Sequence, residues 1–202
     1  MSHNIYNTEG IILSSFGVGE ANKFFNIFTK ELGLIQATAQ SVRELKSKNR
    51  YGLQDFSVSD FSFVRGKEIW RITNVAPQEN LFFKFQEDRK KLDSLVQILS
   101  LLKQFLHGEE KNEELFDIVL NAIGFLKNAN FKVGELENFG LIVKMRILNN
   151  LGYFDKGSQK EIFSEFLQTN NFDENIIDKL GKVKKEAINE INYSLEDVQL
   201  QF

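Results

Sequence analysis

The sequence Phe24-Phe-Asn-Ile-Phe-Thr-Lys-Glu-Leu-Gly-Leu-Ile-Gln-Ala-Thr-Ala39 decides how the first part of the chain folds. It holds two short apolar runs, Phe24–Thr29 and Leu34–Ala39, which are rich in aromatic and β-branched residues. Gly33 lies in the gap between them. Runs of this length and composition, interrupted by glycine, are typical of β-strands joined by short turns. We therefore expect two consecutive strands here.

Further runs of the same kind lie on both sides of this stretch. Gly10–Leu13 precedes it, and Gly17-Val-Gly-Glu20 predicts a hairpin connection between strands. Phe56–Phe63 follows it, with Arg65-Gly-Lys67 as a turn into Glu68–Thr73. About five short strands in so few residues predict a small barrel or sandwich, because closure removes exposed edges.

The spacing of apolar residues becomes helical after the only proline, Pro77. Helical segments are predicted at Leu92–Leu106, Leu115–Leu126, about 135–151, Ile162–Leu167 and Ile176–Ile191. The alternating Val198, Leu200 and Phe202 predict a short final strand. We therefore expect an α+β fold with a small β-barrel over residues 1–80 and an all-helical domain over residues 81–202.

The overall composition of the 202 residues excludes several classes of protein. The hydrophobic content of 42% and the charged content of 26% exclude a disordered or fibrous chain. The absence of cysteine excludes disulfides, a thiol nucleophile and a zinc site with cysteine ligands. Residues 1–6 lack the features of a signal peptide, and no apolar run approaches the roughly 20 residues of a membrane span. A cytoplasmic protein without a membrane segment is expected.

Charge is distributed unevenly along the chain. Residues 1–80 carry a net charge of +1 and residues 81–202 a net charge of −4, which together give −3. Arg43, Lys46, Lys48 and Arg50 lie within eight residues and are opposed only by Glu44. This polar segment predicts an exposed loop that either contacts phosphates or is only a solvated surface.

Aromatic residues in the same part have two alternative roles. Unpaired bases stack on exposed aromatic rings, whereas a barrel this small needs large side chains in its core. The residues concerned are Phe16, Phe24, Phe25, Tyr51 and Trp70.

Patterns that would indicate an enzyme are missing from the sequence. His3 and His107 lie far apart and have no partners at the spacing of metal ligands. The glycine-rich turn at Gly17–Glu20 lacks the ending of a phosphate-binding loop, and there is no Gly-x-Ser-x-Gly motif. We expect no catalysis, no cofactor, no metal and no small-molecule substrate.

Several ordered motifs resemble the DNA repair protein RecO family. Its opening is similar to Thr8-Glu-Gly-Ile-Ile-Leu13, Gly19-Glu20, Phe25-Asn-Ile-Phe-Thr29 and Gly33-Leu-Ile-Gln-Ala37. The basic loop and next strand of that family resemble Ala39-Gln-Ser-Val-Arg43, Lys46-Ser47 and Leu53-Gln54-x-Phe56. A second block, Phe139–Leu148 followed by Leu151-Gly-Tyr153, resembles the family's helical domain.

The resemblance implies an N-terminal OB-fold, a helical domain and a non-catalytic role as recombination mediator in the repair of DNA damage. Such proteins bind single- and double-stranded DNA, anneal complementary strands, associate with RecR and contact the single-strand binding protein SSB. They help to load RecA onto SSB-coated strands, in a cytoplasmic, nucleoid-associated location. Arg43 and Lys46 match the family's basic loop, and charge alone adds Lys48 and Arg50. Weaker DNA-binding candidates are Lys23, Arg65, Lys67 and Arg71.

The sequence also departs from the family pattern. Many relatives follow the Leu-Gly-Tyr turn with paired cysteines that bind zinc, whereas this chain has Phe154–Lys160 there, so no zinc site is expected. The chain is short for the family, which predicts a trimmed helical domain. An alternative function is a protein-interaction adaptor with the barrel as scaffold, which would use an apolar groove near Leu102–Leu106 and Phe139–Leu151.

Overall fold

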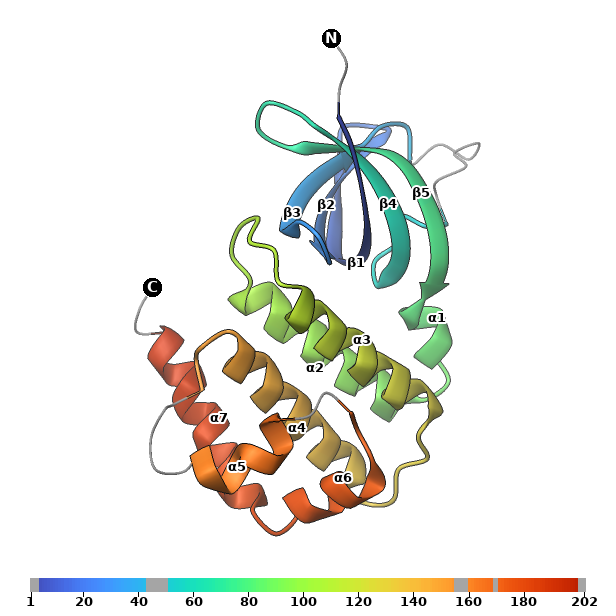
Figure 1. The fold of residues 1–202 in the computed structure, drawn as a ribbon. Coiled ribbons are helices and arrows are strands. Elements are labelled where there is room, and N and C mark those ends of the chain that lie inside the picture. The colour runs from blue at the N-terminus through green and yellow to red at the C-terminus, as the bar shows by residue number, and fades with distance from the viewer. Residues whose placement is uncertain (1–3, 43–50, 155–159, 169–170, 200–202) are drawn as a thin grey trace. The chain divides into compact units, whose positions relative to one another are not determined.

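A computed structural model describes residues 4–42, 51–154, 160–168 and 171–199 of the chain (Figure 1). The strands come first: β1 (Ile5–Val18), β2 (Asn22–Thr29), β3 (Gly33–Ala39), β4 (Ser57–Arg65) and β5 (Trp70–Asn80). The helices follow: α1 (Leu81–Phe85), α2 (Arg89–Phe105), α3 (Glu113–Asn128), α4 (Glu135–Asn150), α5 (Lys160–Leu167), α6 (Glu174–Leu180) and α7 (Lys184–Gln199). Strands followed by helices confirm the predicted α+β class.

The strands form a closed barrel in the order β1-β2-β3-β5-β4 (Figure 1). Strands β3 and β5 pair in parallel, and every other neighbouring pair is antiparallel. A five-stranded Greek-key barrel of this kind is an OB-fold. Because the barrel is closed, it offers a partner its outer faces and turns rather than a free strand edge.

Alternation of side chains along each strand separates the barrel core from its outer surface. In β3, Ile35 and Ala37 are fully buried inside the barrel, whereas Gln36 is exposed and Thr38 is half-buried. This is the period of two that is typical of a strand with one side in the core. The core of the barrel consists of Ile12, Phe25, Ile27, Ile35, Ala37, Ala39, Val42, Leu53, Phe61, Phe63, Trp70 and Val75.

Strands β1 and β5 change neighbours or register along their length. The first part of β1 pairs with β4, and the register with β2 shifts between Ile12 and Ser14. The register of β4 with β5 shifts between Ser62 and Phe63, which leaves Thr73 as an extra residue in β5. Such irregularities bend a strand and change the direction of its side chains. Each of these two strands therefore contributes to two different outer faces of the barrel.

The chain divides into two compact units, the first made of residues 1–89 and 106–116 and the second of residues 90–105 and 117–202. In the first unit, Lys111 Nζ lies 2.6 Å from Glu31 Oε2. Gly33 has a φ of +68°, and a Cβ there would lie 2.2 Å from the carbonyl oxygen of Glu110. Only glycine fits this turn between β2 and β3. The predicted domain division at residue 80 stays a prediction.

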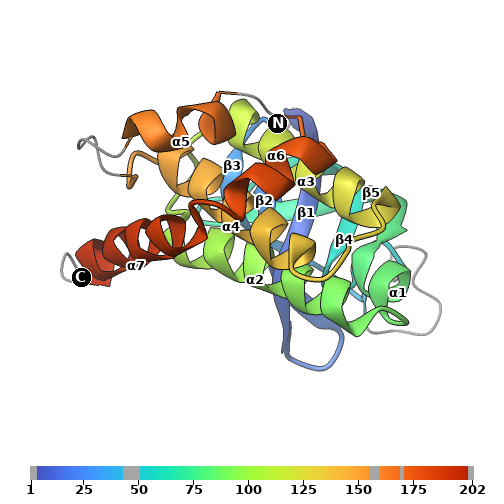
Figure 2. The ribbon, with the colours of Figure 1, turned by 90° about the horizontal axis from the view of Figure 1, so that it is seen from below.

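The second unit is organised around α4, which contacts α5, α6 and α7 (Figure 2). Arg146 of α4 is only 2% exposed. Its Nε donates to the carbonyl of Phe166 at 2.7 Å and its Nη2 to that of Asn171 at 3.1 Å. Burial lowers the pKa of Arg146 to about 10, so the side chain stays charged at neutral pH. This arginine holds the α5–α6 connection against α4.

The structure corrects three sequence predictions in the helical part. The predicted helix Ile176–Ile191 is two helices: α6 ends at Leu180, backbone hydrogen bonds from Gly181, Lys182 and Val183 to the third residue before each turn the chain, and α7 begins at Lys184. Val198 lies in α7 and not in a strand. The apolar groove of the adaptor hypothesis is wrong, because its apolar side chains are almost all buried. The buried ones are Leu102, Phe105, Leu106, Phe139, Leu141, Ile142, Val143, Met145, Ile147 and Leu148.

Within the described ranges, no helix has the length and apolar content needed to cross a membrane.

Candidate nucleic-acid interface

One outer face of the barrel carries a row of side chains that crosses four strands. The register pairs Phe16 of β1 with Phe24 of β2, Phe24 with Thr38 of β3, and Thr38 with Arg71 of β5. Directly paired residues of neighbouring strands point to the same side of a sheet. Strand spacing makes the row about 14 Å long from β1 to β5. We call the surface around this row the aromatic face.

The two phenylalanines of the row stack on each other at the surface, where Phe16 is exposed and Phe24 is half-buried. The ring centres of Phe16 and Phe24 are 4.9 Å apart, with 27° between the ring planes. Phe16 is 54% exposed although it is large and apolar. An exposed aromatic stack is a surface on which an unpaired base can stack.

The five aromatic residues considered from the sequence therefore separate into two groups. Phe25 and Trp70 are buried in the barrel core. Phe16 and Phe24 lie on the aromatic face, and Tyr51 is 77% exposed. Alternation decides the difference between Phe24 and its neighbour Phe25, since successive side chains of a strand point in opposite directions.

Beside the aromatic row lies a second row of polar side chains on the same face, formed by Ser14, Asn26 and Gln36. Asn26 Nδ2 donates to Ser14 Oγ at 3.0 Å. Gln36 is exposed, and its amide has no hydrogen-bond partner within the described part of the chain. Sequence reasoning missed these residues, although the alternation in Leu34–Ala39 already places Gln36 on the side away from the core.

Two turns lie at the ends of the aromatic row, and OB-folds use these two turns together with β2 and β3 to bind oligonucleotides. The β1–β2 turn contains Gly19 and Glu20, and the β4–β5 turn contains Lys67 and Glu68. Gly66 is required in the second turn because a Cβ there would lie 2.4 Å from the carbonyl oxygen of Ile69. Each turn carries one exposed carboxylate, and the second adds an exposed lysine.

The predicted DNA-binding cations differ in how available they are. Arg71 and Lys67 are exposed, and neither forms an ion pair with another described residue. Lys23 is half-buried, and its Nζ donates to Ser15 Oγ at 3.0 Å. Arg65 pairs with Glu109 and lies over the ring of Trp70, 4.7 Å from its centre. Arg71 and Lys67 are therefore open to solvent, whereas Lys23 and Arg65 make contacts with other side chains of the protein.

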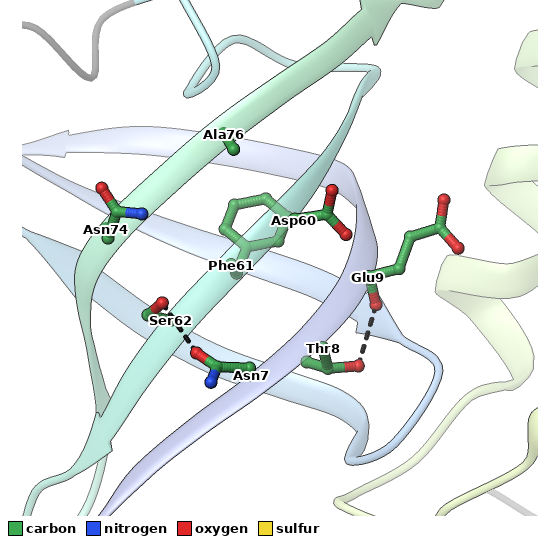
Figure 3. A pocket seen from close by; sticks show the side chains of 8 residues that line it. All are labelled: Asn7, Thr8, Glu9, Asp60, Phe61, Ser62, Asn74 and Ala76. Carbon is green, nitrogen blue, oxygen red and sulfur yellow. Dashed lines mark hydrogen bonds between the residues drawn. The ribbon is translucent and has the colours of Figure 1, made fainter.

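A different outer face, on β1, β4 and β5, contains a pocket of about 300 Å³ (Figure 3). We call this outer face of the barrel the acidic face, because Glu9 and Asp60 lie directly opposite each other on β1 and β4. Gln78 Nε2 donates to Asp60 at 3.1 Å, and Ser62 Oγ donates to Asn7 at 2.8 Å. Within the described part of the chain, no lysine or arginine lines the pocket. Phosphates are repelled by such a surface.

Two family models match the chain, "Recombination protein O N terminal" over residues 1–81 and "Recombination protein O C terminal" over residues 86–159. The chain belongs to the RecO family. The resemblance noted in the sequence is thereby confirmed, and so is the OB-fold expected from it.

Similar RecO proteins come from several bacteria, and each is named "DNA repair protein RecO". The protein of Alkaliphilus metalliredigens is 28% identical over 148 residues, which cover 73% of this chain and 58% of the relative. That of Thermodesulfovibrio yellowstonii is 31% identical over 83% of this chain and 67% of the relative. That of Caldicellulosiruptor saccharolyticus is 30% identical over 75% of this chain and 60% of the relative. The matches thus span about 58–67% of these relatives.

The basic loop of this RecO-family chain lies outside the described residues. Arg43, Lys46, Lys48 and Arg50 belong to the stretch between Val42 and Tyr51, which follows β3. Their contact with DNA stays a prediction, as does that of Lys23, Arg65, Lys67 and Arg71.

The zinc site implied for many RecO relatives does not fit this chain, which has no cysteine. Among the described residues, no three histidine, aspartate or glutamate side chains gather closely enough to hold a metal ion.

Proposed function

We propose that this RecO-family chain is a non-catalytic recombination mediator that binds single-stranded DNA on its aromatic face and anneals complementary strands. The observation that carries the proposal is the exposed Phe16–Phe24 stack in register with Arg71. Stacking on a protein aromatic contributes about 1–3 kcal/mol per base, and a cation at the same row neutralises a phosphate.

Annealing follows from this surface without a bond-making residue. Cations that neutralise phosphates reduce the repulsion between two strands and release counterions. Arg71 and Lys67 supply such charges on the described surface. The proposal adds Arg43, Lys46, Lys48 and Arg50, from their charge and their match to the family's basic loop. Double-stranded DNA would be bound through the same phosphate contacts.

The wider role extends the proposal to partners. In this role the protein contacts RecR and SSB in the cytoplasm, at the nucleoid, and helps to load the recombinase onto SSB-coated strands. The family membership and the shared name of the relatives support a role in DNA repair.

The test is binding of a fluorescent single-stranded oligonucleotide, followed by annealing with its complement. We expect Phe16→Ala to weaken binding by about tenfold, because a stacking surface is lost. The matched control is Phe83→Ala: Phe83 of α1 is also 54% exposed and also contacts a second phenylalanine ring. Equal loss in both variants, or none in either, would contradict the proposal. Nuclease and ATPase assays on the same protein test the absence of catalysis.

A further inference from the structure

The aromatic face contains a gap between Phe24 and Arg71 at the position of Thr38. Phe16 covers one side of the Phe24 ring, and Thr38 follows on the other side because β3 is the next strand. Thr38 is short, and its hydroxyl donates to the carbonyl of Trp70 at 3.5 Å. Arg71 follows on β5, so an aromatic residue and an arginine lie on either side of a small residue.

The width of this gap matches one flat nucleobase. The Cα atoms of Phe24 and Arg71 are two strand spacings apart, which is about 9.6 Å. Bases stack at about 3.4 Å, so a base between two flat groups separates them by about 7 Å. Phenyl rings and guanidinium groups both stack on bases. The remaining distance allows both side chains to adjust around the base.

Gln36 lies at one end of the gap, two residues before Thr38 on the same face of β3. The distance along the strand is about 7 Å, within reach of a glutamine side chain. Its amide offers an acceptor oxygen and two donor hydrogens. The neighbouring Asn26 already donates to Ser14, whereas Gln36 has no partner within the described residues.

We infer that Phe24, Thr38 and Arg71 form a slot for a single unpaired nucleobase, whose edge hydrogen-bonds to Gln36. This inference rests on the proposed function and specifies the bound group. The Watson–Crick edge of every base carries a donor beside an acceptor, so the amide can match any base in a single strand. In a duplex that edge is occupied and the base is stacked between its neighbours. The slot therefore selects unpaired strands, and a base must leave it before it pairs.

The experiment compares two short single strands of equal length. One is oligothymidylate, and in the other every thymine is replaced by difluorotoluene, which keeps the shape of thymine but lacks its hydrogen-bonding edge. For each protein we take the ratio of its affinity for the thymine strand to its affinity for the isostere strand. We expect this ratio to be about three- to tenfold higher in the parent protein than in Gln36→Leu, which is the range for one hydrogen bond. Gln78→Leu is the matched control, because Gln78 bonds to Asp60 near the acidic face.

Each result decides the inference. If Gln36→Leu loses the preference and Gln78→Leu keeps it, the slot is supported. If the preference for the thymine strand over the isostere strand is the same in Gln36→Leu as in the parent protein, the slot is overturned. If the parent binds neither strand, the proposed function itself fails and the slot with it. If Phe16→Ala weakens binding to oligothymidylate while Gln36→Leu keeps the preference of the parent protein, the proposed function is supported and the slot is overturned.

Discussion

The aromatic face and the acidic face belong to the same closed barrel but offer opposite chemistry. The aromatic face has the Phe16–Phe24 stack, exposed Arg71, and the amide of Gln36, which has no hydrogen-bond partner among the described residues. The acidic face has Glu9 opposite Asp60 and a pocket that no described lysine or arginine lines. Strands β1 and β5 contribute to both, on either side of their register shifts. The fold thus supplies the scaffold, and single outward residues decide which face suits a nucleic acid.

The difference also shows why net charge is a poor guide to function in this protein. A net charge of −3 gives no general attraction for DNA. In the proposed function, exposed Arg71 in register with the phenylalanine stack nevertheless suits one face to a nucleic acid, while opposed carboxylates make the acidic face unsuitable. A binding surface of this kind is local, and it has to be located by strand register.

The largest expected effect is on the free energy of unfolding, and it distinguishes an inward-facing from an outward-facing residue of β2. Phe25→Ala should lower the free energy of unfolding by about 3–5 kcal/mol, because it empties a fully buried site in the barrel core. Phe24→Ala should cost under about 1 kcal/mol, since Phe24 lies on the outer surface. Urea denaturation measures both. Comparable losses would show that Phe24 belongs to the core and is no binding surface.

The next effect concerns the charges of the two faces. Arg71→Ala should reduce the slope of log K against log salt for single-stranded DNA by about 0.7, which lowers affinity about fivefold at 0.1 M salt. Asp60→Ala, the matched change on the acidic face, should leave the slope unaltered. Titrations at several salt concentrations measure it. An unchanged slope in Arg71→Ala would show that this arginine does not contact the DNA backbone.

A smaller effect is expected for Arg65, which the sequence places among the DNA-binding candidates. Its guanidinium pairs with Glu109 and lies over Trp70. Because the pair is solvent-exposed, Arg65→Ala should cost at most about 1 kcal/mol of stability. The variant should bind single-stranded DNA like the parent. A loss of affinity as large as that of Arg71→Ala would assign Arg65 to the interface instead.

The smallest effect is a gain in stability on the acidic face. Asp60→Asn removes the repulsion between directly opposed carboxylates and keeps an acceptor for Gln78. We expect the free energy of unfolding to rise by about 0.2–1 kcal/mol. Asn74→Asp, which adds a charge at the same pocket, should have the opposite sign in the same urea experiment. Destabilisation by Asp60→Asn would mean that the carboxylate has a binding partner.

Local patterns in the sequence predicted most of the barrel and part of the helical unit. Short apolar runs rich in aromatic and β-branched residues located β2 and β3, and the glycines located the turns. The break between α6 and α7 was not predicted, because the helical spacing of Leu180, Val183 and Ala187 continues across the short turn that separates the two helices. Val198 alternates with its neighbours in the sequence, yet it continues a helix that begins at Lys184.

The candidate site was less predictable than the fold, because it depends on strand register. Sequence reasoning identified Phe24 and Arg71 separately, but the pairing that joins them through Thr38 includes a parallel contact between β3 and β5. Likewise, Arg65 and its partner Glu109 are 44 residues apart, so nothing local distinguished Arg65 from the exposed Lys67. Gln36 lies in a predicted strand, but an uncharged amide gives no signal in the sequence that marks it as a DNA-binding residue.

The most direct test of the central claim is to map where a single strand lies on the protein. A strand containing 5-bromouracil, irradiated in the complex with the intact chain, forms covalent adducts with nearby side chains that peptide mass spectrometry locates. We predict adducts in the peptides containing Phe16 and Phe24. Adducts confined to the peptide containing Phe82 and Phe83, or to the strands of the acidic face, would contradict the assignment of the aromatic face.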